Sequence, residues 1–424
     1  MVEKDQGILK LKGKITRRDF FSCSFKSLLG SIGLFSFWSH SLNRSFNINT
    51  RFSGVDYHIK NYRPLGNLGY KVSDIGFGTV GFSDSAVLNF ALDCGINYID
   101  TAYVYSNGRA EEAVGEVMKN RRREVFLTTK FNTAAFRMAD IKGGLEESLN
   151  RSLKRLKSDY VDCVMVHNGK VWDVEREELL EFFHRARKEG KVRFLGLSGH
   201  GGHTPEAMDK AIETGEYSVF MPAFGYTTYK GVAESMKKAS EKGIAVVAMK
   251  TLAAAYEARI KGWEKQVYGG FNPRINRFSR DFAASAFSWV LKHDFVSNLV
   301  IGMRNIEHVR KYVPASGNEY GQRDEQLLKS YTQSIEENYC RIGCDKCLNY
   351  CPNNVAIDDI LRFDLYFRNY GIEEEARMHY AALANEKQAL SCFKCSAPCD
   401  KRCVYGVPIK KKLTKFHELI SRYV

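Results

Sequence analysis

Eight of the eleven cysteines fall into two short runs near the carboxy terminus. The first run is Cys340, Cys344, Cys347 and Cys351, and the second is Cys392, Cys395, Cys399 and Cys403. Four thiolates in a short run can hold an iron–sulfur cluster or a zinc ion, and in an oxidising compartment eight cysteines can form four disulfides. The spacing therefore predicts two metal centres or a disulfide framework.

A second set of polar residues follows apolar segments in the middle of the chain. Asp100, Lys130 and His167 each end a stretch with the composition of a buried strand. In a parallel α/β barrel, catalytic side chains project from the carboxyl ends of the strands. If these strands form a barrel, the three residues belong to one site.

Eight predicted strands alternate with helical segments such as residues 141–156, where leucines recur at a helical period. This alternation is typical of a parallel sheet. An open doubly wound sheet is the alternative, but no G-x-G-x-x-G follows the first strand. We therefore predict an α/β fold, a (β/α)8 TIM barrel with a C-terminal, mainly helical iron–sulfur domain. The predicted strands are 73–78, 97–100, 125–130, 161–167, 193–198, 218–221, 245–249 and 298–302.

The segments at these strand ends resemble the aldo-keto reductase family over roughly residues 62–313. The stretch Asn-Tyr-Ile-Asp-Thr-Ala-Tyr-Val-Tyr at 97–105 carries most of the resemblance. Lys130 and His167 continue it on the next two strands. Further matches are Tyr62–Gly66, Gly76–Thr79 and Gly302–Asn305.

The resemblance implies roles for four residues. Tyr105 is expected to donate a proton to the substrate carbonyl oxygen as general acid. Lys130, held by Asp100, is expected to bring the pKa of the phenol toward the working range. His167 is expected to hydrogen-bond the same oxygen and orient the carbonyl. Singly, each could be an ordinary core or surface residue; together and in this order they predict a catalytic site.

The same resemblance implies a nicotinamide coenzyme, NADP or NAD. Gly78 and Thr79 match first-strand backbone that approaches the nicotinamide, and Ser198 matches a contact to its carboxamide. Gly199 stands where the family has asparagine, and Met221 where it often has glutamine, so that contact departs from the family pattern.

Phosphate and ribose contacts are expected from residues after the last two barrel strands. The candidates are Lys250, Gly302, Arg304 and Asn305. Arg304 favours a 2′-phosphate and hence NADP.

The two cysteine runs resemble the two-cluster bacterial ferredoxin arrangement, in which the fourth cysteine of each run ligates the other cluster. Pro352 follows the first run, but no proline follows Cys403, and spacings in both runs exceed the usual two residues. The resemblance implies two 4Fe–4S clusters, and the longer spacings leave open whether each site holds this number of iron atoms. Two zinc sites and four disulfides remain alternatives.

The amino terminus resembles a twin-arginine signal. Thr16-Arg17-Arg18-Asp19-Phe20-Phe21 precedes the uncharged, apolar segment 27–39, and Ser39-His40-Ser41 is a poor cleavage site. A basic helix packed on the barrel is the alternative. The resemblance implies the export machinery as a partner and a periplasmic location.

Composition narrows the remaining possibilities. The net charge is +14, but the Lys and Arg residues are scattered, so we expect no nucleic-acid partner. No stretch has the length and hydrophobicity of a membrane span. The expected parts are residues 1–42 as signal, 43–61 as linker, 62–320 as barrel, 321–339 as helical link and 340–424 as cluster domain.

The leading hypothesis is hydride transfer between the nicotinamide and a small carbonyl or alcohol substrate. The clusters would then serve a redox partner protein or the fold alone. The alternative is a redox sensor or docking module that uses the barrel for binding only. The loops 200–203 and 256–276, which would select the substrate, match nothing specific.

Overall fold

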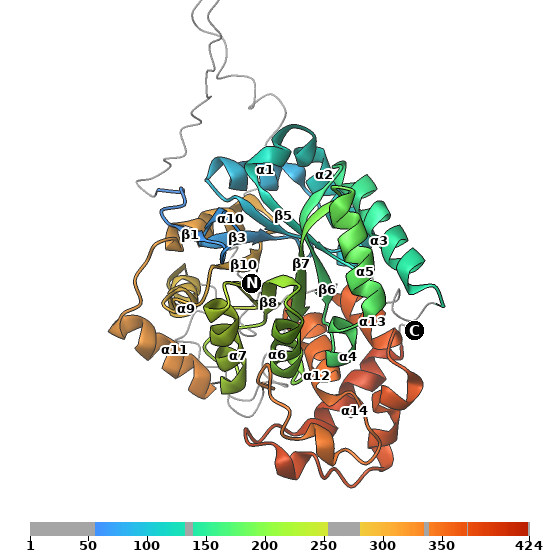
Figure 1. Cartoon of the computed structure of the whole chain (residues 1–424). Coiled ribbons are helices and arrows are strands. Elements are labelled where there is room, and N and C mark those ends of the chain that lie inside the picture. Colours follow the sequence, from blue (N-terminus) through green and yellow to red (C-terminus); the bar gives the residue numbers. More distant parts are fainter. Residues whose placement is uncertain (1–55, 132–138, 253–279, 335–338, 371, 423–424) are drawn as a thin grey trace, which may run out of the picture. The chain divides into compact units, whose positions relative to one another are not determined.

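The computed structural model describes residues 56–131, 139–252, 280–334, 339–370 and 372–422. Its centre is a closed parallel barrel with the strand order β10-β3-β4-β5-β6-β7-β8-β9, surrounded by helices (Figure 1). The barrel prediction is confirmed, and each predicted strand lies within two residues of an observed one. The strands are β3 Ile75–Gly78, β4 Tyr98–Asp100, β5 Phe126–Lys130, β6 Val161–His167, β7 Val192–Gly199, β8 Tyr217–Pro222, β9 Ala245–Met249 and β10 Asn298–Gly302.

The helices that follow the strands bury their apolar faces against the barrel. In α3 (Ile141–Leu156), four leucines at a helical period are buried. Asp140 caps its first turn by accepting from the Gly143 amide at 2.9 Å. The others are α1 Ser85–Asp93, α2 Arg109–Arg121, α4 Val171–Val174, α5 Glu177–Lys188, α6 Thr204–Thr214, α7 Lys230–Glu241, α9 Arg280–Leu291 and α10 Ile306–Tyr312, with short helices η1 Tyr105–Gly108, η2 Arg122–Glu124 and η4 Val313–Ala315.

A hairpin that was not predicted packs into the amino-terminal end of the barrel. It consists of β1 (Tyr62–Pro64) and β2 (Lys71–Ser73). At its turn Gly66 has φ +49°, and a Cβ there would lie 2.5 Å from the Gly243 carbonyl oxygen. Only glycine allows so close an approach. The hairpin thus closes the end of the barrel opposite the expected active site.

Helix α11 (Gln322–Ser334) lies within the segment expected as a link, and it packs on α9. The ring of Tyr331 is fully buried, with its centroid 4.9 Å from that of Phe282. This helix therefore shares the core of the barrel.

The carboxy-terminal residues form short helices around a second apolar core, drawn in orange to red in Figure 1. That core includes Phe363, Phe416 and three of the eight clustered cysteines, Cys347, Cys392 and Cys399. The elements are η6 Leu348–Tyr350, α12 Ile357–Leu365, the π-helix η7 Tyr366–Tyr370, α13 Glu373–Ala381, η8 Asn385–Lys387, η9 Ala389–Lys394, η10 Asp400–Arg402 and α14 Ile409–Ile420.

The predicted signal at 16–21, its cleavage site and Cys23 lie outside the described residues, as does the loop 256–276. Within the described part, none of the helices has the length and apolar character needed to cross a bilayer.

Candidate active site

A buried ion pair joins the carboxyl ends of two neighbouring strands. Lys130, the last residue of β5, donates to both oxygens of Asp100 at the end of β4, with distances of 2.6 and 2.7 Å. The ammonium also donates to the Thr101 carbonyl oxygen at 2.9 Å, and the Thr128 hydroxyl donates to Asp100 at 3.0 Å. A buried charge pair is stable only when its other hydrogen-bonding capacity is satisfied, as it is here.

Tyr105 and His167 lie against this pair. Tyr105 begins η1, directly after the β4 loop, and its ring centroid is 5.0 Å from the Lys130 Nζ. The His167 ring, at the end of β6, stands perpendicular to the phenol with centroids 6.2 Å apart. The four residues predicted to act together therefore lie together at the carboxyl ends of the strands.

The expected lowering of the Tyr105 pKa is wrong. Burial raises the pKa of Tyr105 well above its ordinary value of 10.0, and the negative charges of Asp100 and Glu375 raise it further. The ammonium of Lys130 is held by both oxygens of Asp100, so its charge is largely balanced. The phenol therefore remains protonated at neutral pH, which is the state that a proton donor requires.

His167 is a neutral imidazole at neutral pH. Burial lowers its pKa well below 6.5, and the positive charge of Lys130 lowers it further. A neutral imidazole can donate a hydrogen bond from one ring nitrogen and accept one at the other. It can thus orient a carbonyl group without adding a charge to the site.

Strained backbone accompanies the strand ends of this site. Ser106, Asn168 and Lys250 have φ values of +50°, +55° and +56°. Non-glycine residues rarely adopt this region, and such strain concentrates at functional sites. Ser106 follows Tyr105, Asn168 follows His167, and Lys250 follows the last residue of β9.

The expected nicotinamide contacts are buried at the strand ends. A Cβ on Gly78 would lie 3.0–3.1 Å from atoms of β10, and the Thr79 hydroxyl pairs with that of Thr101 at 2.9 Å. The Ser198 hydroxyl donates to the Val166 carbonyl oxygen at 3.2 Å. These polar groups hold neighbouring strands together, and glycine at position 78 lets β3 and β10 approach each other closely.

The other expected coenzyme residues are divided between two places. Arg304 and Asn305, which follow Gly302 at the end of β10, line a cavity of about 550 Å³. Asn305 also caps α10, accepting from the His308 amide at 2.9 Å. The opposite lining includes Glu373, Glu374 and Glu375 of α13. Because Arg377 also lines this cavity, its lining carries charges of both signs.

Lys250 instead lies in the mouth of the barrel. Its Nζ is 5.3 Å from the centroid of the Tyr366 ring in the carboxy-terminal domain. Burial lowers the pKa of Lys250 to about 7, and the positive charges of Arg362 and Lys130 lower it further. This lysine is therefore an electrostatic neighbour of the catalytic pair.

Sequence reasoning missed the residues that the carboxy-terminal domain adds to the site. Glu375 of α13 accepts from the Ser106 amide at 3.3 Å, next to Tyr105. His379 contributes to lowering the pKa of His167, and Tyr366 packs 6.4 Å from His200. These contacts join segments more than 160 residues apart, so no local pattern signals them.

The fourth cysteine of each run acts electrostatically on thiols of the other run. Burial, together with the negative charge of a thiolate at Cys403, raises the pKa of Cys340 to about 12. The same charge also raises the pKa of Cys344 and of Cys347. In the second run, burial and the negative charge of a thiolate at Cys351 raise the pKa of Cys392 and of Cys399 to about 11. Cys395 acts on Cys392 as well.

Cys351 and Cys403 have matching surroundings. Cys351 Sγ accepts from the Val355 amide and Cys403 Sγ from the Val407 amide, both at 3.3 Å. All ten cysteines in the described segments are free thiols. Across those segments, no three His, Cys, Asp or Glu side chains are arranged to hold a metal ion.

The other free thiols, Cys94 and Cys163, are fully buried. They pack as small residues in the apolar core.

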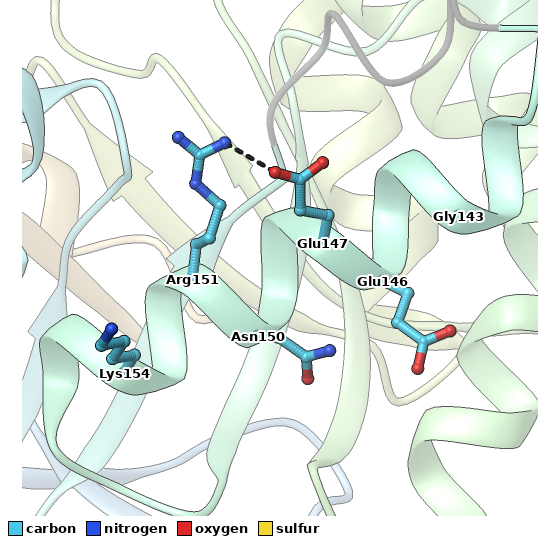
Figure 2. A pocket seen from close by; sticks show the side chains of 6 residues that line it. All are labelled: Gly143, Glu146, Glu147, Asn150, Arg151 and Lys154. Carbon is cyan, nitrogen blue, oxygen red and sulfur yellow. Dashed lines mark hydrogen bonds and ion pairs between the residues drawn. The ribbon is translucent and has the colours of Figure 1, made fainter.

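Another hollow, of about 450 Å³, is remote from this chemistry. Figure 2 shows that the side chains lining it all come from α3, including the ion pair between Glu147 and Arg151 at 2.9 Å. No strand end contributes to it, so it offers no catalytic group.

Comparison with known proteins gives consistent results. The model of the aldo/keto reductase family matches residues 74–330. An uncharacterized oxidoreductase of Bacillus subtilis, YqkF, is 33% identical over 147 residues, covering 32% of this chain and 48% of that protein. The chain thus spans about half the length of this relative.

Two further matches cover more of the chain. The aldo-keto reductase AFTS1 of Alternaria alternata is 24% identical over 65% of this chain and 93% of its own length. The holo form of the aldo-keto reductase AKR11C1 from Bacillus halodurans superposes with a TM-score of 0.52 at 24% identity, covering 64% of this chain and 96% of that one. This structural likeness supports the fold. The chain belongs to the aldo/keto reductase family, a family of nicotinamide-dependent oxidoreductases.

Proposed function

We propose that the chain catalyses NAD(P)-dependent reduction of a carbonyl compound to an alcohol, and the reverse oxidation. The observation that carries this proposal is the placement of the Tyr105 phenol against His167 and the buried Lys130–Asp100 pair. A bound nicotinamide would supply the hydride. The residues of the chain would bind and orient the carbonyl group and deliver the proton.

The proton step follows from the site geometry. Tyr105 Oη donates its proton to the carbonyl oxygen as the alcohol forms, and the phenolate left behind lies near the Lys130 ammonium. His167 holds the same oxygen by a hydrogen bond. A proton from solvent then restores the phenol, so the tyrosine is unchanged over one cycle.

The described residues fit a polar coenzyme. Two buried polar atoms at the strand ends, Asn168 Oδ1 and Thr251 Oγ1, have no hydrogen-bond partner within the described structure. Such atoms are costly unless a ligand or water satisfies them. Asn168 follows His167, and its amide lies 3.4 Å from the Ser198 hydroxyl oxygen. A nicotinamide carboxamide would donate a hydrogen bond to Asn168 Oδ1. Asn168 would then hold the carboxamide, which Gly199 and Met221 cannot hold as the family's Asn and Gln do.

The test is an assay of nicotinamide absorbance with NADPH and with NADH over a panel of aldehydes, ketones and sugars. Reduction of any compound in the panel supports the proposal. The rates with NADPH and with NADH, measured on the same compound, show which coenzyme the protein uses. Silence across the panel, with coenzyme bound, would instead favour the redox-sensor or docking function.

We further propose that the eight clustered cysteines hold two 4Fe–4S clusters, which serve a redox partner protein or the fold. The two sets of four thiols and the paired amide donors to Cys351 and Cys403 support this. Analysis of anaerobically purified protein should give iron and sulfide near two clusters per chain. Zinc, or an absence of free thiols after denaturation, would replace this proposal with one of its alternatives.

We also propose export through the twin-arginine route to the periplasm, on the evidence of Arg17 and Arg18 before an apolar segment. Replacing both arginines by lysine should leave the protein in the cytoplasmic fraction. Unchanged periplasmic recovery would contradict the proposal.

A further inference from the structure

The turn that follows Tyr105 has an unusual backbone. Ser106, Asn107 and Gly108 have φ values of +50°, +54° and +86°. Glycine adopts this region readily, whereas other residues visit it singly and persist there only where the surrounding structure holds them. Because the turn begins at Tyr105, its shape sets the direction of the phenol. Something outside the turn must therefore hold this shape.

A carboxylate from the carboxy-terminal domain binds the turn. Glu375 of α13 is 6% exposed, and its Oε1 accepts from the Ser106 amide at 3.3 Å. The Ser106 carbonyl oxygen accepts from Arg109 Nε at 2.9 Å, and Arg109 pairs with Glu374 at 3.6 Å. That ion pair is exposed to solvent, and exposed ion pairs contribute little. The buried carboxylate is therefore the stronger of these two links between α13 and the turn.

Glu375 also acts on the phenol itself. Its negative charge and that of Asp100 add to the effect of burial, which raises the pKa of Tyr105 well above 10.0. Burial is the largest cause, and it does not depend on Glu375. The phenol therefore stays protonated at neutral pH when Glu375 loses its charge. A variant can thus separate the charge of this side chain from its hydrogen bond.

The position of Glu375 depends on the fold of the carboxy-terminal domain. Ala376 and Tyr380 of the same helix are buried in the second apolar core, which also contains Cys392. The Tyr380 hydroxyl oxygen accepts from the Ala389 amide at 3.1 Å, three residues before that cysteine. The carboxylate can therefore reach the turn only when the cysteine-rich domain is folded against the barrel.

Stabilisation of its own helix is the simpler role for Glu375. It lies in the first turn of α13 with Glu373 and Glu374, where negative charges interact favourably with the helix N-terminus. The first two carboxylates are exposed and can serve this role from solvent. Glu375 is instead buried, and the amide that it binds lies 269 residues away along the chain. This contact favours a role in the site.

We infer that Glu375 is a positioning residue of the reductase, which holds the turn at 106–108 and thereby fixes the Tyr105 phenol against His167 and Lys130. The inference rests on the proposed function and deepens it. Glu375 acts through Tyr105. The carboxy-terminal domain thereby completes the catalytic site of the barrel.

The experiment compares three variants of the full chain. Glu375→Met keeps the length of the side chain but cannot accept a hydrogen bond, and Glu375→Gln keeps an acceptor oxygen without the charge. Glu386→Met is the control, because Glu386 is an exposed carboxylate of η8 in the same domain. Iron content and melting temperature are measured for each variant. If Glu375→Met does not fold, Glu375→Ala replaces it.

The first measurement is single-turnover reduction at pH 7, with saturating NADPH and protein in excess. The probe is 4-nitrobenzaldehyde, or the compound of the panel reduced fastest if that aldehyde is not reduced. Misplacement of the phenol lowers the rate constant, whereas a smaller folded fraction lowers only the amplitude.

We expect the rate constant of Glu375→Met to fall about 10–100-fold, since a displacement of about 1 Å can cost that much. Its NADPH affinity should match the wild type. Glu375→Gln can still accept from the Ser106 amide, so its rate constant should lie closer to the wild type than to Glu375→Met. The control should not change. A role confined to helix stability would lower the melting temperature and leave the rate constants equal, which would overturn the inference.

Hydrogen–deuterium exchange at the Ser106 amide gives a readout without turnover. Exchange should be faster in Glu375→Met than in the wild type and unchanged in the control. Slower reduction with unchanged exchange would overturn the inference, because the effect would not pass through the turn. Faster exchange with an unchanged rate constant would overturn it too, because the turn would not position the phenol. If the wild type reduces nothing in the panel, the reductase proposal fails, and faster exchange then shows only that Glu375 holds the turn.

Discussion

At the scale of single residues, the chemistry depends on keeping the Tyr105 phenol both protonated and close to a cation. Removing its hydroxyl in Tyr105→Phe deletes the proton donor and changes little packing. We expect carbonyl reduction to fall by roughly 10²–10⁴-fold while coenzyme affinity stays within about twofold of wild type. Steady-state rates and coenzyme titration measure the two effects. Turnover above about a tenth of wild type would remove Tyr105 from the acid role.

The pKa directions predict how catalysis responds to pH. Burial raises the pKa of Tyr105 above 10.0 and lowers that of His167 below 6.5, so neither changes its protonation between those values. The pH profile of kcat for reduction should therefore show no ionisation of Tyr105 or His167 between about pH 7 and about pH 9.5. A kcat that falls with a midpoint near pH 8 would show that the phenol ionises earlier than its burial implies.

At the scale of elements, close helix packing fixes where the strand ends lie. Gly115 in α2 faces α3, and a Cβ there would lie 2.2 Å from the Arg155 carbonyl oxygen. Gly115→Ala should lower the free energy of unfolding by about 1–3 kcal/mol, because the backbone of α3 must move. Gly231→Ala in α7 is the control, since its nearest neighbours lie 3.9 Å away. Equal stability of the two variants in denaturant titration would contradict this account.

The exchange of the fourth cysteines is tested at the same scale. Cys403→Ser should damage the cluster held by Cys340, Cys344 and Cys347, and Cys351→Ser the cluster held by the other three thiols. Electron paramagnetic resonance of the reduced variants can resolve the two clusters. The prediction fails if each substitution damages the cluster of its own sequence run.

Local sequence patterns predicted most of the barrel but not what covers it. The largely apolar β6 and the leucine period of α3 are local signals, and both elements appear at the predicted residues. The β1–β2 hairpin was missed because its three-residue strands are too short to show a period. Tyr366 packs in the core of the carboxy-terminal domain and also contacts Lys250, and this long-range contact has no signature in either segment.

At the scale of the whole molecule, the carboxy-terminal helices add residues to the candidate site in the barrel, and this bears on what the proposed clusters would do. Nicotinamide passes two electrons as hydride, whereas a 4Fe–4S cluster passes one, and the chain shows no flavin-binding pattern to connect them. Because α12 and α13 help to form the mouth of the barrel, loss of the clusters should also disturb coenzyme binding. The proposed clusters would therefore matter for catalysis without exchanging electrons with the substrate.

The proposed export of this barrel raises the question of where its coenzyme would come from, since the periplasm has no expected pool of it. We predict that the exported protein keeps a coenzyme loaded before export and turns over by oxidising one substrate and reducing a second on the same bound molecule. Retention requires slow dissociation, which the covering helices α12 and α13 would favour. Protein purified from the periplasmic fraction without added coenzyme, then denatured, should release close to one nicotinamide per chain. An empty site that binds NADP⁺ only weakly would rule out this cycle and require an external source of hydride.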